Sequence, residues 1–104
     1  MISVIFNKQD DKFVSMTVTG HANFDDLGED VVCAGVSSII FGALNGFDEL
    51  AKDNFDIVVT ENLITVNVLE SVCISDKLLS FVHLQLKTVE QQYSDNIGIT
   101  IMEV

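Results

Sequence analysis

Hydrophobic residues in this chain follow two periods, which alternate several times along its length. A period of two residues, typical of a strand with one buried face, opens the sequence. It runs through two segments, first Ile2, Val4 and Phe6 and then Val14, Met16 and Val18. The polar residues Gln-Asp-Asp at 9–11 separate these segments and favour a turn. Residues 2–19 therefore predict a β-hairpin whose apolar side faces a core.

Two later segments have the three- and four-residue spacing of helices that pack on a core. The first carries Val32, Val36, Ile39, Ile40, Ala43, Leu44, Phe47 and Leu50, and the second carries Leu78, Leu79, Val82, Leu86, Val89 and Tyr93. Asp30 is the expected N-cap of the first helix, and Ser75 or Asp76 that of the second. Phe81 and Leu84 lie off the second stripe, which favours a further contact surface such as a homodimer interface.

Three further strands complete the pattern. Residues 57–60 and 63–69 are expected to form a hairpin around Glu61-Asn62, and residues 97–101 a last strand. The predicted order is ββαββαβ. Strands that arrive in hairpins, with only two helices between them, predict an α+β fold with a mostly antiparallel sheet packed against both helices.

Length and cysteine content predict one domain, residues 1–104, in a reducing compartment. A chain of 104 residues buries roughly two thirds of its unfolded surface and needs no disulfide or metal for a core. Its two cysteines, Cys33 and Cys73, are expected to be free thiols in a soluble, cytoplasmic protein. The longest apolar run, residues 36–44, falls short of the roughly 20 residues that span a bilayer.

The charge balance bears on partners. Sixteen acidic and five basic residues give a formal net charge of −11. This charge repels the phosphate backbone, so direct binding of nucleic acid is not expected. The same field contributes to solubility and attracts a basic partner.

A histidine and a cysteine suggest a nucleophilic site. Gly20-His21-Ala22 follows the second strand, a glycine-containing acidic loop spans residues 20–30, and Cys33 would be the third residue of the first helix. The positive end of a helix dipole favours a thiolate, and a histidine can accept the thiol proton. Unpaired amides at the helix start can hold an oxyanion, and Ala34 and Gly35 leave room for a substrate carbonyl. Gly20, Ala34 and Gly35 are therefore the candidates for an oxyanion or loop role.

Each of these residues also has a plainer interpretation. Cys33 is on the apolar side of its helix and fits a packed core thiol, and His21 fits a loop histidine bonded to a carboxylate. Asp30 suits a cap, a residue that orients the histidine, or both. Cys73, beside Val72 and Ile74 at the end of a strand, is expected to be an inert packed thiol, and His83 a packed or half-exposed histidine. No metal-ligand spacing or nucleotide motif is present, so neither metal nor cofactor is expected.

Gly20-His21-Ala22 together with Asp30-Val31-Val32-Cys33-Ala34-Gly35-Val36-Ser37 resembles the signature of the ribosomal-processing cysteine protease family, Prp. The likeness extends over essentially the whole chain. It implies a homodimeric Cys-His peptidase, with Cys33 as nucleophile, His21 as base and Asp30 as the nearby aspartate. The implied substrate is the precursor of large-subunit ribosomal protein twenty-seven, which loses an N-terminal extension. The resemblance also implies a flexible loop and an apolar groove for the substrate, to which Phe24 and Leu27 are candidate contributors.

Two other functional classes fit the same residues. The first is a non-catalytic acidic binding module, or assembly factor, that holds a basic ribosomal protein while His21 and Cys33 merely pack. The second is a redox-sensing thiol protein, which would need Cys73 to approach Cys33 in space.

Overall fold

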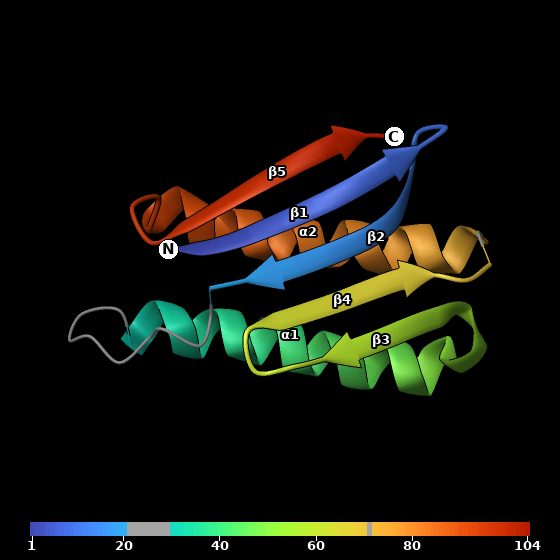
Figure 1. Ribbon diagram of the computed structural model, residues 1–104, viewed down its shortest axis with the longest axis horizontal. Coiled ribbons are helices and arrows are strands. Elements are labelled where there is room, and N and C mark those ends of the chain that lie inside the picture. Colours follow the sequence, from blue (N-terminus) through green and yellow to red (C-terminus); the bar gives the residue numbers. More distant parts are fainter. Residues whose placement is uncertain (21–29, 71) are drawn as a thin grey trace.

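The computed structural model describes residues 1–20, 30–70 and 72–104, and for Asp30 it describes the backbone alone (Figure 1). Its strands are β1 (Ile2–Gln9), β2 (Lys12–Thr19), β3 (Phe55–Val59), β4 (Leu63–Val68) and β5 (Ile97–Glu103). Its helices are α1 (Asp30–Leu50), the short 3-10 helix η2 (Lys52–Asn54) and α2 (Cys73–Gln92). The predicted order of strands and α-helices, ββαββαβ, is confirmed.

The five strands form one sheet in the order β3-β4-β2-β1-β5. β1 pairs with β5 in parallel, and the other three pairings are antiparallel, as the α+β prediction requires. Both α-helices cover the same face of the sheet and run in opposite directions (Figure 1). The two edges of the sheet are therefore β3 and β5.

The core lies between this face and the two helices. The sheet contributes Ile2, Val4, Phe6, Met16, Val18, Ile64, Val66 and Ile97, and the helices contribute Val32, Val36, Ile40, Phe47, Leu79, Val82 and Leu86. Burial of these apolar side chains is the main term that stabilises the fold. The helical stripes expected from the sequence supply this contact. Leu50 and Tyr93 are the exceptions, because Leu50 is 65% exposed beyond the core, and Tyr93 is the C-cap that follows α2 and is 38% exposed.

A β-bulge shifts the second strand relative to the expected alternation. Asn7 pairs with Ser15 but Lys8 pairs with Phe13, so Val14 is the extra residue. Phe13 is consequently buried, whereas Val14 is only partly covered, and the expectation that Val14 faces the core is wrong. The Phe13 N–H donates to a carboxylate oxygen of Asp76 at 2.8 Å, which ties the hairpin to α2.

The start of α2 differs from both predicted caps. The helix begins at Cys73 and its N-cap is Val72. Ser75, which is almost fully buried, reaches back from inside the helix, where its hydroxyl accepts from the Val72 N–H at 3.2 Å and donates to the Val72 carbonyl at 2.7 Å. Asp76 instead accepts the Phe13 N–H. Ser75 thus stabilises the first turn, although it is not the cap residue.

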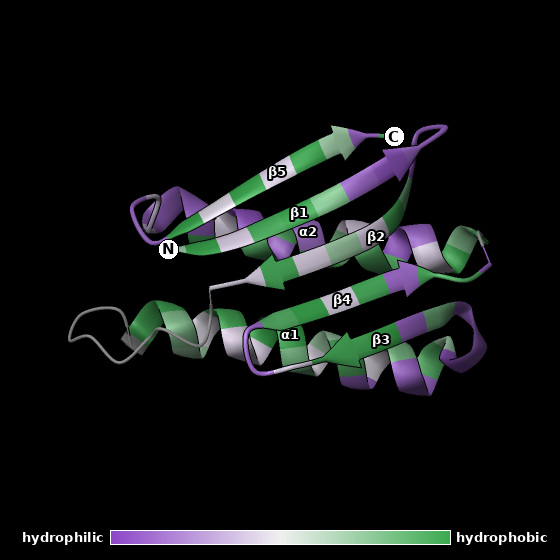
Figure 2. Ribbon diagram, in the orientation of Figure 1, coloured by the Kyte–Doolittle hydropathy of each residue, from purple (hydrophilic) through white to green (hydrophobic). Residues whose placement is uncertain are grey.

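Helix α1 is apolar over a longer stretch than the run at residues 36–44 predicts. Residues 31–50 form a helical segment that is long and apolar enough to cross a bilayer by length and composition alone. Figure 2 shows hydrophobic residues along most of α1. Its stripe of Val32, Val36, Ile40 and Phe47 packs on the sheet, as in the core helix of a globular domain.

His83 is half-buried on α2, as predicted. Its ring lies edge-on to Phe6, with centroids 5.1 Å apart, and tilted against Phe13 at 5.6 Å. Desolvation by burial, and then the charges of Lys87 and Lys8, lower the pKa of His83 below 6.5, against an opposing contribution from Glu90. The neutral ring is therefore the favoured form in this apolar setting.

Gly20 ends the hairpin in a conformation that needs glycine. Its φ is +85°, and a Cβ there would overlap the carbonyl oxygen of Met1. We expect Gly20→Ala to lower the free energy of unfolding by at least about 1 to 2 kcal/mol, because both the backbone strain and the overlap must be accommodated. Urea denaturation monitored by circular dichroism measures this change.

The matched control is Gly35→Ala, inside α1, where an added Cβ meets no described atom within 4 Å. That variant should gain up to about 1 kcal/mol through helix propensity. Equal stability of Gly20→Ala and the parent protein would contradict the role given to Gly20.

Candidate active site

Cys33 is the fourth residue of α1, in the first turn of the helix. The helix begins at Asp30, one residue earlier than the N-cap prediction placed it. The Cys33 side chain is half-buried and packs against the margin of the hydrophobic core. It therefore combines the partial packing of a structural thiol with access to solvent near the positive end of the helix dipole.

Ser37 lies one turn further along α1, next to Cys33. The Cys33 Sγ and the Ser37 Oγ are 3.9 Å apart, within range of a weak sulfur hydrogen bond. Ser37 also lines a small apolar notch, whose other lining residues are Val18, Val36, Ile40, Phe41 and Ile64. The notch thus opens beside the thiol, between the start of α1 and the adjoining ends of β2 and β4.

The base predicted for this thiol lies outside the described residues. His21, Phe24 and Leu27 fall within 21–29, and so does most of the loop expected at 20–30. The structure describes the two ends of that loop, Gly20 after β2 and the backbone of Asp30 at the start of α1. Both ends lie at the same end of the molecule as Cys33 (Figure 1).

The start of α1 at Asp30 changes which amides are available for an oxyanion. The first helical residues lack intrahelical acceptors for their N–H groups, and here these residues are Asp30, Val31 and Val32. Ala34 and Gly35 are the fifth and sixth helical residues, so their amides belong to the helical hydrogen-bond ladder. They do leave space, because Ala34 is exposed and a Cβ on Gly35 would meet no described atom within 4 Å.

Cys73 has a different setting from the one expected. It is the first residue of α2 and is exposed, so the prediction of a packed thiol at the end of a strand is wrong. Because the two α-helices run in opposite directions, Cys73 and Cys33 lie at opposite ends of a molecule 41 Å long (Figure 1). Cys73 is therefore not placed to act as a resolving partner for a redox-active Cys33.

Comparison with known proteins shows to which class of protein this chain belongs. The family model for the cysteine protease Prp matches residues 1–98. The chain belongs to the Prp family. Prp is a family of cysteine proteases, so the non-catalytic binding module proposed as an alternative gives way to an enzyme.

Relatives support this assignment over nearly the full length. The ribosomal processing cysteine protease Prp of Bacillus subtilis is 33% identical over 108 residues, covering 96% of both chains. That of Mycoplasma pneumoniae is 43% identical over 87 residues, covering 80% of this chain and 82% of its own. The crystal structure of Staphylococcus aureus Prp in complex with a covalently linked product peptide is 27% identical, with a TM-score of 0.86 over 97% of this chain and 99% of the other.

Two features of the candidate site were not predicted from the sequence. The notch beside Cys33 joins residues of α1 to Val18 and Ile64, which come from two different strands. Phe41, eight residues after Cys33, also lines the notch, although the hydrophobic stripe assigned it no role. Spacing along α1 could have found Ser37 and Phe41, which follow Cys33 at four-residue intervals. The two strand residues could not have been found this way.

Proposed function

We propose that this protein is a cytoplasmic peptidase that removes an N-terminal extension from the precursor of large-subunit ribosomal protein twenty-seven. The observation that carries this proposal is the position of Cys33. It is half-buried in the first turn of a helix and contacts Ser37, which lines a small apolar notch, in a chain whose relatives are ribosomal processing proteases. The net charge of −11 adds attraction toward a basic ribosomal protein.

The proposed chemistry uses Cys33 and His21. The His21 imidazole takes the proton of the Cys33 thiol, and the sulfur attacks the scissile carbonyl carbon. The oxyanion then accepts hydrogen bonds from the free amides of the first turn of α1. When the C–N bond breaks, His21 returns its proton to the leaving amine, and water hydrolyses the thioester. Asp30, at the start of α1, is proposed to orient His21.

Removal of the nucleophile should abolish processing. We expect Cys33→Ala to lower kcat/KM for the precursor by at least about 10³-fold, because no covalent intermediate can form. Mass spectrometry of the purified precursor before and after incubation with the enzyme measures this loss.

The matched control is Cys73→Ala, which removes the other thiol at the far end of the molecule and should leave the rate unchanged. Full activity in Cys33→Ala, or its loss in Cys73→Ala, would move the nucleophile away from Cys33.

Alkylation tests the dyad separately from the choice of substrate. In a Cys73→Ala background, iodoacetamide should label Cys33 near neutral pH faster than it labels Cys73 in a Cys33→Ala background. Replacing His21 with Ala should slow the labelling of Cys33, because the base that takes the thiol proton is lost. Equal labelling rates of Cys33 with and without His21 would exclude the dyad and leave the role of Cys33 to the processing assay.

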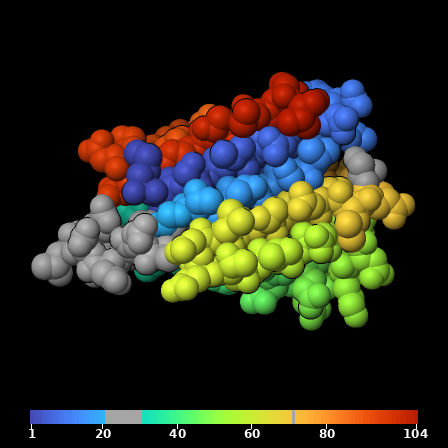
Figure 3. Space-filling model, viewed as in Figure 1, coloured from blue at the N-terminus to red at the C-terminus, as the bar shows by residue number. Residues whose placement is uncertain are grey.

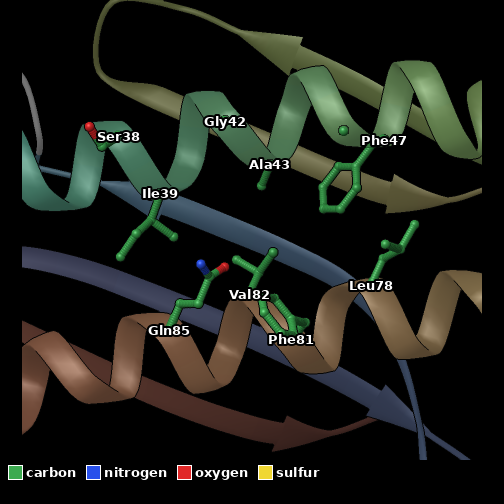
Figure 4. Close-up of a pocket in the computed structure, with 10 residues that line it drawn as sticks. Ser38, Ile39, Gly42, Ala43, Phe47, Leu78, Phe81, Val82 and Gln85 are labelled. Atoms are coloured by element: carbon green, nitrogen blue, oxygen red, sulfur yellow. The ribbon is translucent and has the colours of Figure 1, made fainter.

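We also propose that two copies associate through their helical layers. A groove of about 260 Å³ lies between α1 and α2, with Gly42, Ala43 and Phe47 on one side and Leu78 and Val82 on the other (Figure 4). Phe81 and Leu84 project beside it, 63% and 60% exposed. The same face therefore offers both a protruding ring and a hollow, as a two-fold interface requires.

Charge favours this face over the others. The sequence holds no Asp or Glu between residues 31 and 47, or between residues 77 and 89, although the chain carries sixteen acidic residues. Two copies that meet through α1 and α2 thus avoid most of their mutual repulsion.

Phe81→Glu should weaken this self-association at least about tenfold, because a carboxylate would be buried at the interface. Sedimentation velocity across a concentration series measures the dissociation constant. Met102→Glu adds the same charge at a 49% exposed residue of β5 and serves as the control. Equal dissociation constants for the two variants would exclude the helical layer as the interface.

A further inference from the structure

The outer edge of β3 presents unpaired backbone groups. The Leu69 N–H donates to the Asn54 carbonyl, and the Thr60 N–H donates to the Leu63 carbonyl. The backbone N–H and C=O groups of residues 54, 56, 58 and 60 therefore face β4. Phe55, Ile57 and Val59 therefore direct their N–H and C=O groups away from the sheet. Within residues 1–20, 30–70 and 72–104, none of these outward groups has a hydrogen-bond partner.

The opposite edge of the sheet is partly closed. The backbone groups of alternate β5 residues face β1, as the bond from the Val104 N–H to the Lys8 carbonyl indicates. The N–H and C=O groups of Ile97 and Ile99 therefore point away from the sheet. The Ile97 N–H donates to the Tyr93 carbonyl at 3.2 Å, and the Ile99 N–H donates to the Glu90 carboxylate at 2.8 Å. Proteins commonly protect edge strands in this way against pairing with another chain. β3 has no comparable cover in the described part of the chain.

A chain of neighbouring residues connects the β3 edge to Cys33 through Ile64, which is itself buried. Val59 lies directly opposite Ile64 on the core side of the sheet. Ile64 lines the notch together with Phe41 and Ser37, and Ser37 contacts the thiol of Cys33. Each step of this path is a pairing or contact between described residues.

The lengths of α1 and β3 allow one extended peptide to lie along β3 and reach Cys33. Phe47 and Phe55 stack with ring centroids 4.4 Å apart and align α1 with β3, which run in opposite directions (Figure 1). Cys33 is about 21 Å from Phe47 along the helix. Val59 is about 13 Å from Phe55 along the strand. Along this shared direction Cys33 therefore lies about 8 Å beyond Val59, a distance that roughly two to three extended residues span.

We propose that the outer edge of β3 receives the substrate as an added β-strand and directs its scissile bond toward Cys33. This inference rests on the proposed peptidase function. Backbone groups of Phe55, Ile57 and Val59 hold the peptide, and every second side chain of the peptide lies over α1 near Phe41, a ring that is 43% exposed. The substrate class is thus an extended peptide with apolar residues at alternate positions next to the cleavage site.

Charge and shape at this edge agree with such an occupant. Asp56 lies within β3, and Asp53 and Glu61 flank the strand. They favour a peptide with basic flanking residues, and they oppose edge-to-edge pairing with a second acidic copy. Figure 3 shows β3, in yellow-green, at the surface along one border of the molecule, with β5 along the opposite border.

Proline substitution on each edge tests the proposal. The probe is a fluorescein-labelled peptide of about fifteen residues, roughly 50 Å when extended, from the start of the organism's own precursor of ribosomal protein twenty-seven. Binding is measured by fluorescence anisotropy on the Cys33→Ala protein, so that it does not depend on cleavage. Adding Val59→Pro removes one outward N–H and leaves the bonds of Val58 and Thr60 to β4 in place. It should weaken binding by about fivefold or more.

The control adds Ile101→Pro to the same Cys33→Ala protein. The backbone N–H of Ile101 also points away from the sheet on an edge strand. The side chain of Ile101 is 42% exposed, close to the 49% of Val59. Binding to this control should equal that of Cys33→Ala alone. Equal effects of the two prolines, absence of peptide binding to Cys33→Ala, or conversion of a dimer to a monomer by Val59→Pro would each overturn the proposal. A wild-type enzyme that fails to cleave the precursor would instead count against the proposed function.

A second measurement leaves the protein backbone unchanged. Single N-methylation along the peptide should weaken binding at every second position near the cleavage site, because only alternate amides face β3. Uniform effects along the peptide, or none, would contradict strand addition even if Val59→Pro failed to fold.

Discussion

The packing of α1 along the sheet is the contact on which the rest of this structure depends. Val32, Val36, Ile40 and Phe47 bury one stripe of the helix against the strands, and the stacking of Phe47 on Phe55 fixes its far end. Because the helix is a single rigid element of 21 residues, this packing along its length determines where its first turn lies. Cys33 is consequently held beside the ends of β2 and β4, half in and half out of the core. The same helix borders the groove toward α2 on one side and the notch toward β4 on the other.

The order of elements could be predicted because each apolar stripe has the period of the element that buries it. Local details failed where the deciding partner is distant in sequence. The bulge that buries Phe13 instead of Val14 accompanies a bond from the Phe13 N–H to Asp76, sixty-three residues away. Leu50 continues the stripe of α1, yet the helix has by then passed the end of the core. The strand interpretation of Val72 and Cys73 failed because the buried Ser75 hydroxyl starts a helix there.

The candidate site was predictable to a different degree for each residue. The position of Cys33 in the first turn of α1 could be predicted, because a helix start coincides there with a motif that resembles a known family, and its role as nucleophile stays a prediction. The surroundings of its thiol could not be found, because Val18 and Ile64 reach the notch only through the pairing of β2 with β4. The amides expected to hold an oxyanion shifted from Ala34 and Gly35 to earlier residues, since one residue at a helix boundary decides which N–H groups are free. The roles of His21 and Asp30 remain predictions from the sequence.

The β3 and β5 edges of the sheet differ in how they are protected, and the open β3 edge carries a risk of pairing with other chains. An open edge rich in β-branched residues invites pairing with any extended chain, and the chain contains no proline with which to interrupt it. On β5 the Glu90 carboxylate covers one of the exposed amides, whereas among the residues that the structure describes β3 is protected only by the charge of Asp53, Asp56 and Glu61. Charge is a selective form of protection, because it repels other acidic copies of this chain and admits a basic one. An edge protected in this way can stay open to a ribosomal substrate without promoting self-aggregation.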